Sequence, residues 1–287
     1  MSRALRRPVP VPPSPVLVIA LEGWIDAGFA AASAVASLLE TLETQQLATF
    51  DFADLIDQRA RRPRLRIDDG VRGPIRWPEP ELRTGSDRRG AGLLLLVGPE
   101  PDFRWQSFAA EVRELAVELD VRLVVGLGAF PTAVPHTRPI RLTSTASDPT
   151  LADRVGFIAG SLDVPAGIAD VIGEECTRAG IPSVGLWARV PHYVAGMPYA
   201  PAALALVEGL AAVAGLDLPT SKLAEAADAS RRQVDELIAQ SEEHAAMVRQ
   251  LEAQLDAVED PGLHLGGRLP SGDEIAAELE RFLRGER

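Results

Sequence analysis

The stretch VLVIALEGWIDAG, residues 16–28, decides the fold. Val16 to Leu21 is an apolar, β-branched run of strand length, and Ala27 to Leu42 is an Ala-rich stretch with helical spacing. The residues Glu22 to Ile25 form the connecting loop. Asp26 stands where its carboxylate can accept hydrogen bonds from the first amides of the helix. The segment therefore predicts a strand, a loop and a capped helix.

Similar units follow along the chain. Gly92–Gly98 and Val121–Val125 are fully apolar, which is typical of strands covered on both faces by helices. Further strands are expected at Thr49–Phe52, Ile140–Ser144 and Ser183–Val190, and helices at Trp105–Leu119, Ala166–Ala179 and Ala202–Ala214. The pattern predicts an α/β fold, with a sheet that helices cover on both faces.

A β-ribbon is expected between these units, at Leu65–Leu82. Its predicted turns are Asp68-Asp69-Gly70 and Arg72-Gly73-Pro74, because Gly and Pro favour turn conformations.

The last part of the chain has a helical pattern. From Leu223 to Val258, residues of one stripe recur in steps of four and three, which predicts one long helix. Glu259–Pro270 reads as a turn, and Ser271-Gly272-Asp273-Glu274 as a capping box that opens a final helix. We therefore expect a C-terminal helical hairpin, and we divide the chain into a disordered tail at 1–15, an α/β core at 16–218 and a helical extension at 219–287.

Charge and cysteine content limit the function. The formal net charge is -12, and the segment from residue 221 onward is the most acidic, so a nucleic-acid surface is not expected. No apolar run approaches the roughly 20 residues that span a bilayer, and the Pro-rich start does not resemble a secretion signal. The single cysteine, Cys176, permits no internal disulfide, which suits the reducing cytoplasm.

The first candidate site follows the first strand. Glu22, Trp24 and Asp26 lie at its carboxyl end, where open α/β sheets usually bind ligands. The alternative is that they form only a helix cap and a packed indole. Gly126 and Gly128 follow another strand and could let a ligand approach backbone amides, or they could simply form a tight turn with positive φ.

A second group of candidates lies in later loops. Arg138, near His136 in a Pro-rich loop, could hold an anion or could only close an interface. His192 and Tyr193 follow the strand that ends near Val190. The four histidines have no metal-ligand spacing, Cys176 is flanked by carboxylates that blunt a thiol, and no nucleophile motif occurs, so neither a metal nor a cofactor is expected.

Three segments resemble a known family. These are Leu21–Gly28, Gly180–Ala188 and, most specifically, Val190–Tyr199, VPHYVAGMPY. They are similar to the proteasome assembly chaperone type 2 family, and in particular to its actinobacterial branch of unknown function. The resemblance implies a three-layer fold like that of nucleoside phosphorylases, with a mixed central sheet between helix layers, followed by C-terminal helices. It also implies homo-oligomers that include trimers, and binding to other proteins. Family chaperones dock through a C-terminal hydrophobic-Tyr-any tripeptide, but this chain ends Gly285-Glu286-Arg287, so docking by that tripeptide is not expected.

Two functions therefore remain open. The first is a non-enzymatic protein-binding or assembly protein that forms homo-oligomers. The second is a protein that binds or converts a nucleoside-like or nucleotide-like molecule in the cleft at the carboxyl ends of the strands, using Glu22, Trp24, Asp26, Arg138 and His192.

Overall fold

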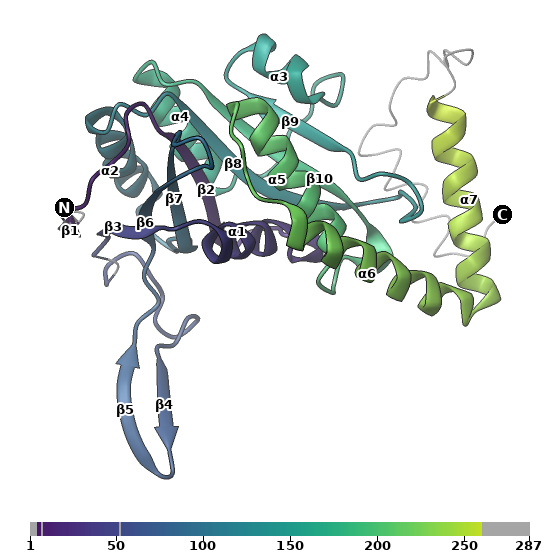
Figure 1. Ribbon diagram of the computed structural model, residues 1–287, viewed down its shortest axis with the longest axis horizontal. Helices are drawn as coiled ribbons and strands as arrows, with labels where there is room; N and C mark the ends of the chain where they lie inside the picture. Colours follow the sequence, from purple (N-terminus) through teal and green to yellow (C-terminus); the bar gives the residue numbers. More distant parts are fainter. Residues whose placement is uncertain (1–4, 7, 52, 260–287) are drawn as a thin grey trace.

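The computed structural model describes residues 5–6, 8–51 and 53–259 (Figure 1). Its strands are β1 (Leu5–Arg6), β2 (Val16–Glu22), β3 (Gln45–Thr49), β4 (Arg64–Asp68), β5 (Val71–Arg76), β6 (Glu81–Ser86), β7 (Gly92–Pro99), β8 (Leu123–Thr132), β9 (Leu142–Ala146) and β10 (Ser183–Pro191). Its α-helices are α1 (Ala30–Thr41), α2 (Trp105–Glu118), α3 (Pro149–Val155), α4 (Ile168–Arg178), α5 (Ala200–Ala214), α6 (Ser221–Ala239) and α7 (Glu242–Glu259), and its 3-10 helices are η1 (Ala27–Phe29) and η2 (His192–Val194).

The described strands form one large sheet and one ribbon. The large sheet has eight strands in the order β1-β3-β6-β7-β2-β8-β10-β9, whereas β4 and β5 pair with each other. The four central strands, β7, β2, β8 and β10, run parallel, and the strands that flank them pair antiparallel. The predicted mixed sheet flanked by helices is therefore confirmed.

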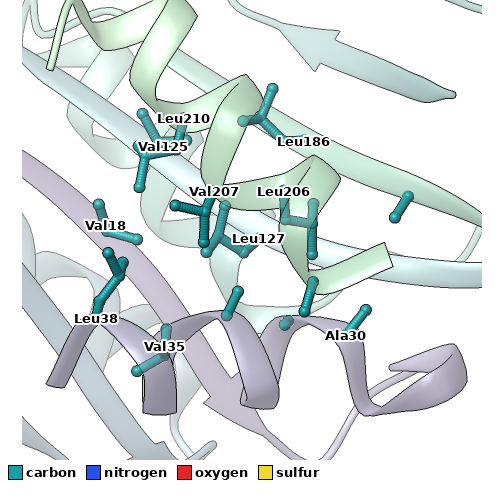
Figure 2. Packing of buried hydrophobic residues seen from close by; sticks show 14 of the residues in the cluster. Val18, Ala30, Val35, Leu38, Val125, Leu127, Leu186, Leu206, Val207 and Leu210 are labelled. Carbon is teal, nitrogen blue, oxygen red and sulfur yellow. The ribbon is translucent and has the colours of Figure 1, made fainter. Parts of the chain in front are cut away.

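Each face of the sheet packs against its own helices. Val16 and Val18 of β2 join the hydrophobic cluster of α1 and α5, as Figure 2 shows for Val18. Leu17 and Ile19 point to the other face and join the cluster of α2 and α4. Because side chains alternate along a strand, a strand covered on both faces must be apolar at every position, as VLVIAL is.

The helix after β2 begins with a short 3-10 turn, η1, before α1. The Asp26 carboxylate accepts hydrogen bonds from the amides of Ala31 at 2.8 Å and Ala32 at 3.1 Å. The predicted capping role is therefore confirmed. Gly28 has a φ of +66°, and a Cβ there would lie 2.9 Å from the Cβ of Tyr199, so the turn requires glycine.

The predicted strand at Thr49–Phe52 is wrong in position, because β3 covers Gln45–Thr49. The ribbon is confirmed as β4 and β5, and its turn at Asp69-Gly70 has positive φ at both residues. Arg72-Gly73-Pro74 is not a turn, because these residues lie within β5. Nor do Gly126 and Gly128 form a tight turn, because β8 continues through them in parallel pairing with β10.

The single long helix predicted from Leu223 to Val258 is also wrong, because the chain breaks at Gln240-Ser241 into α6 and α7. The Ser241 hydroxyl accepts a hydrogen bond from the His244 amide, as an N-cap does, and two glutamates follow in the first turn of α7. The expected stripe still contributes the buried residues Leu223, Val234 and Leu251. The predicted turn at Glu259–Pro270 and the helix after Ser271 lie outside the described residues, apart from Glu259, which ends α7. The domain division stays a prediction.

In the described ranges, no helix combines the length and the apolar composition needed to cross a bilayer.

Asp87 ties the turn between β6 and β7 to the linker between α5 and α6. Its buried carboxylate accepts hydrogen bonds from the amides of Arg89, Ala91 and Asp217, at 2.7 to 2.8 Å. Burial alone would raise the pKa of Asp87, but these three amides and the Arg89 charge outweigh burial, so the pKa lies below its ordinary value.

We expect Asp87→Asn to lower the free energy of unfolding by about 2 kcal/mol at pH 7, because an amide cannot accept from all three donors. Since the folded-state pKa is depressed, this stabilisation is present above the ordinary carboxyl pKa of about 4 and is lost as the pH falls through the folded-state value. Urea unfolding should show a constant difference between pH 5 and 7 that shrinks below about pH 4. Asp228→Asn, at an exposed ion pair with Arg231, is the control and should change stability by less than about 0.5 kcal/mol.

Candidate functional site

A cavity of about 690 Å³ lies at the carboxyl end of β2 and beside the amino-terminal halves of β8 and β10. The first turns of α4 form another part of its wall, through Gly167, Ile168 and Asp170. The carboxyl ends of parallel strands are the usual ligand-binding edge of an open α/β sheet. The cavity therefore has the predicted position with respect to β2, but not with respect to β8 and β10.

Five of the candidate residues line this cavity. Glu22, Trp24 and Asp26 come from the end of β2 and the loop after it, and Gly126 and Gly128 come from β8. The structure thus brings together two groups that are about 100 residues apart in the sequence.

The glycines of the cavity make room for indole rings. A Cβ at Gly128 would lie 2.5 Å from the Trp187 ring, and a Cβ at Gly185 would lie 3.0 Å from its Nε1. Trp24 lies equally close to Gly167, with 3.1 Å between its Cδ1 and a Cβ placed there. These glycines therefore admit aromatic side chains to the wall, a role that the pattern Gly-Leu-Gly alone does not reveal.

Glu100 also lines the cavity, and the sequence analysis missed it. It follows the apolar strand β7, so it carries the same signal as Glu22: a carboxylate directly after a buried parallel strand. The residue is only 8% exposed, and its Oε2 has no hydrogen-bond partner in the described part of the chain. Burial raises the pKa of Glu100, although the Arg61 guanidinium opposes this shift.

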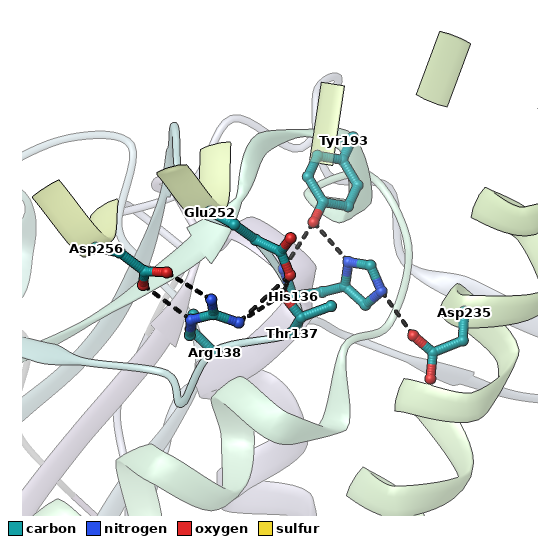
Figure 3. A network of polar contacts seen from close by, with 7 residues as sticks. All are labelled: His136, Thr137, Arg138, Tyr193, Asp235, Glu252 and Asp256. Atoms are coloured by element: carbon teal, nitrogen blue, oxygen red, sulfur yellow. Dashed lines mark hydrogen bonds and ion pairs between the residues drawn. The ribbon is translucent and has the colours of Figure 1, made fainter. Parts of the chain in front are cut away.

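Arg138, His192 and Tyr193 do not line the cavity. Figure 3 shows Arg138 and Tyr193 beside residues of α6 and α7. The Arg138 guanidinium makes two hydrogen bonds to Asp256, at 2.7 and 3.0 Å, and one to Glu252 at 3.3 Å. His192 is exposed, with its ring against Tyr193. The structure therefore separates these residues from Trp24, and the cleft predicted to contain both Trp24 and His192 does not form.

Tyr193 belongs to a buried network with His136. The Tyr193 hydroxyl lies 2.7 Å from His136 Nδ1 and accepts from the His136 backbone amide at 2.7 Å. His136 Nε2 lies 2.9 Å from Asp235 Oδ1 on α6. Because the Asp235 carboxylate accepts hydrogen bonds, His136 Nε2 is placed to donate to it, while Nδ1 and the Tyr193 hydroxyl form the other hydrogen bond of the ring.

This network holds helices rather than a reacting group. Burial, with repulsion from Glu252 and Asp235, raises the pKa of Tyr193 to about 12, so its hydroxyl stays protonated at neutral pH. Together with Arg138, the network fastens the loop after β8 to α6 and α7, which matches the interface alternative for Arg138.

Little in the described chain points to catalysis by a thiol or a metal. Cys176 is buried in α4, and burial raises its pKa to about 11, so the thiol is unreactive. Among the described residues, no three His, Cys, Asp or Glu side chains gather as a metal site requires.

Comparisons with known proteins show which family and which solved structures this chain is similar to. The model of the PAC2 family matches residues 20–238. Among solved structures, the Mycobacterium tuberculosis protein of unknown function Rv2714 is 38% identical, with a TM-score of 0.81 and 87% of each chain covered. A Corynebacterium glutamicum protein of unknown function is 31% identical, with a TM-score of 0.84, covering 91% of this chain and 98% of its own.

A further solved relative carries a functional description. The Mycobacterium tuberculosis proteasome-assembly chaperone homologue Rv2125 is 35% identical, with a TM-score of 0.75, covering 81% of this chain and 99% of its own. A search of curated proteins found no match.

We expect Arg138→Ala to loosen α7 without unfolding the core. The variant loses its ion pairs to Glu252 and Asp256, which lie at the surface and are individually weak. Amide hydrogen exchange in α7 should therefore become about fivefold faster, while exchange in β2 stays unchanged.

The matched control is Arg249→Ala, which removes an exposed ion pair between Arg249 and Glu242 within α7. It should change exchange by less than about twofold. Equal exchange rates in the two variants would show that Arg138 does not hold the helix.

Proposed function

Because this chain belongs to the PAC2 family, we propose that it binds other proteins and assists their assembly, and that it does so without catalysis. The observation that carries this proposal is the family match, with a proteasome-assembly chaperone homologue 35% identical over 81% of the chain. We further propose that the protein works in the cytoplasm. A chain with a single cysteine forms no internal disulfide, which suits a reducing compartment.

The β4–β5 ribbon, called here the arm, supports a protein-binding function. Figure 1 shows that it projects away from the body of the molecule. Leu65, Ile67, Val71, Ile75 and Trp77, on the arm and directly after it, are 41% to 70% exposed. Because a lone two-stranded ribbon is barely stable in water and exposed apolar patches mark contact sites, the arm is suited to pack against another protein.

Charge suggests what the arm contacts. Residues 59–76, which comprise the arm and the five residues before it, contain seven arginines and two aspartates, a formal charge of +5 in a chain of net charge -12. The arm itself, residues 64–76, accounts for +2 of this charge. Residues 221–259, which form α6, α7 and their junction, contain nine acidic and four basic residues, a formal charge of -5. We therefore propose that the arm of one copy contacts α6 and α7 of a second copy, by opposite charge at the rim and apolar packing at the centre.

Such a contact joins two different surfaces of the same chain. Head-to-tail contacts of this kind close into rings when the rotation between copies allows it. We therefore propose that the protein forms a homo-oligomer. After the dimer, the smallest closed ring is a trimer.

The oligomer is tested with Leu65→Ser/Ile67→Ser/Ile75→Ser, a variant whose three changes are all exposed and should not disturb the core. We expect light scattering to show an oligomer for the unchanged protein and a monomer for this variant, because an interface that loses its apolar centre dissociates. Val117→Ser, at an exposed apolar position of α2, should remain oligomeric.

A second variant, Glu236→Lys/Glu243→Lys, tests the acidic helices at exposed positions. It should also be monomeric, yet a mixture of the two variants should form heterodimers, because one arm and one acidic surface remain intact. The proposed contact would be wrong if the unchanged protein were a monomer, or if the mixture of the two variants stayed monomeric.

The assembly function is tested with unassembled proteasome α and β subunits from the same genome. We expect native gels to show faster formation of assembled rings when the purified chain is added in equimolar amount. The monomeric arm variant should be slower than the unchanged protein if the client uses the oligomer. An unchanged assembly rate would exclude the proteasome as the client.

A further inference from the structure

The cavity at the carboxyl end of β2 has an uneven set of charges. Among the described residues that line it, five are carboxylates and none is Lys, Arg or His. Three more are aromatic. The carboxylates are Glu22, Asp26, Glu100, Asp170 and Glu174, and the aromatic residues are Trp24, Phe29 and Trp187. We propose that this cavity binds an organic cation, an ammonium or guanidinium group on an apolar or aromatic body.

Glu100 provides the anchor. Buried polar atoms almost always have a hydrogen-bond partner, yet the Glu100 Oε2 has none among the described residues, although the residue is more than nine-tenths buried. The nearby Arg61 does not fill this position, since it donates to the Glu100 backbone carbonyl and its guanidinium stays 4.0 Å from Oε1. A bound N–H donor would supply the missing partner, and its positive charge would offset the cost of burying the carboxylate.

The other carboxylates act mainly through their charge. Asp26 and Asp170 already accept hydrogen bonds from backbone amides, at the starts of α1 and α4. Glu174 pairs with Arg178, and Glu22 is exposed near Trp24. Together they make the cavity negative, and a low-dielectric wall strengthens such a field toward a cation.

The aromatic residues favour the same class of ligand. Trp24 is about half exposed, so part of its indole is available in the cavity, and Trp187 contributes a second indole to the wall. An ammonium or guanidinium group over an indole face gains a cation–π attraction, and the rings also pack against an apolar body.

A phosphate-bearing ligand fits this cavity poorly. The start of α4 lines the cavity, and a helix N-terminus by itself attracts anions. Here, however, the Asp170 carboxylate already occupies that position, bonded to the Gly167 amide at 2.9 Å. Arg61 lies near Glu100 and Arg178 pairs with Glu174, but the five carboxylates outnumber these two cations. The nucleotide alternative from the sequence is therefore the outcome that counts against this inference.

The test uses three probes with one indole body: tryptamine, tryptophol and indole-3-acetate, titrated calorimetrically into the full chain. Tryptamine should bind, tryptophol should bind at least about tenfold more weakly, and indole-3-acetate should not bind, because only the ammonium pairs with Glu100. ATP and inorganic phosphate should give no heat of binding.

The matched variant is Glu100→Gln, which keeps the shape and removes the charge. It should weaken tryptamine binding about tenfold and leave tryptophol binding unchanged, whereas Glu40→Gln, at an exposed pair with Lys222, should change neither. If Glu100→Gln fails to fold, Trp24→Ala at its half-exposed position should weaken tryptamine binding. The inference would be overturned if tryptamine did not bind at millimolar concentration, or if tryptophol bound as tightly as tryptamine. It would also be overturned if ATP or phosphate bound more tightly than tryptamine, or if Glu100→Gln bound tryptamine as tightly as the unchanged protein.

Discussion

The burial of four parallel strands on both faces is the constraint on which the rest of the structure depends. β7, β2, β8 and β10 lie between α1 and α5 on one face and α2 and α4 on the other, so their middle positions admit apolar or small side chains. Polar groups are thereby displaced to the strand ends. Glu22 and Glu100 stand at the carboxyl ends of neighbouring strands for this reason, and the cavity forms where those ends meet.

This constraint also explains what could be predicted from the sequence. Apolar runs such as VLVIAL and LLLLV indicate buried strands directly, and Glu22 and Asp26 could be assigned to the strand end from their position alone. Glu100 carries the same signal after β7 and could have been found. Trp187 could not, because its place in the wall depends on glycines of the neighbouring strand, a contact between residues about 60 positions apart that no local pattern records. Residue type alone groups Arg138 and His192 with Trp24, although Arg138 pairs with residues of α7 and the His192 ring lies against Tyr193.

The net charge of -12 is unevenly distributed over the protein. The arm is basic and carries exposed apolar side chains, whereas α6 and α7 are acidic and are fastened to the body by Arg138 and the His136 network. The salt bridges of Arg138 are individually weak, so buried residues such as Val248 and Leu251 must supply most of the attachment of α7. What remains exposed on these helices is mostly charged, which is why they are better suited to meet a basic surface than to form a further core.

The arm and the cavity, although they serve different contacts, meet at one residue. Arg61 lies at the base of the arm, donates to the Glu100 backbone carbonyl and pairs with Asp102 at 3.6 Å. Asp102 in turn accepts from the Asp57 amide and donates to the Leu55 carbonyl, so the segment 55–61 is held on the segment 100–102. The ribbon therefore projects from a fixed base rather than from a free loop. Because the Arg61 guanidinium lies 4.0 Å from Glu100 Oε1, any charge that enters beside Glu100 changes the electrostatic environment of the residue that holds the arm in place.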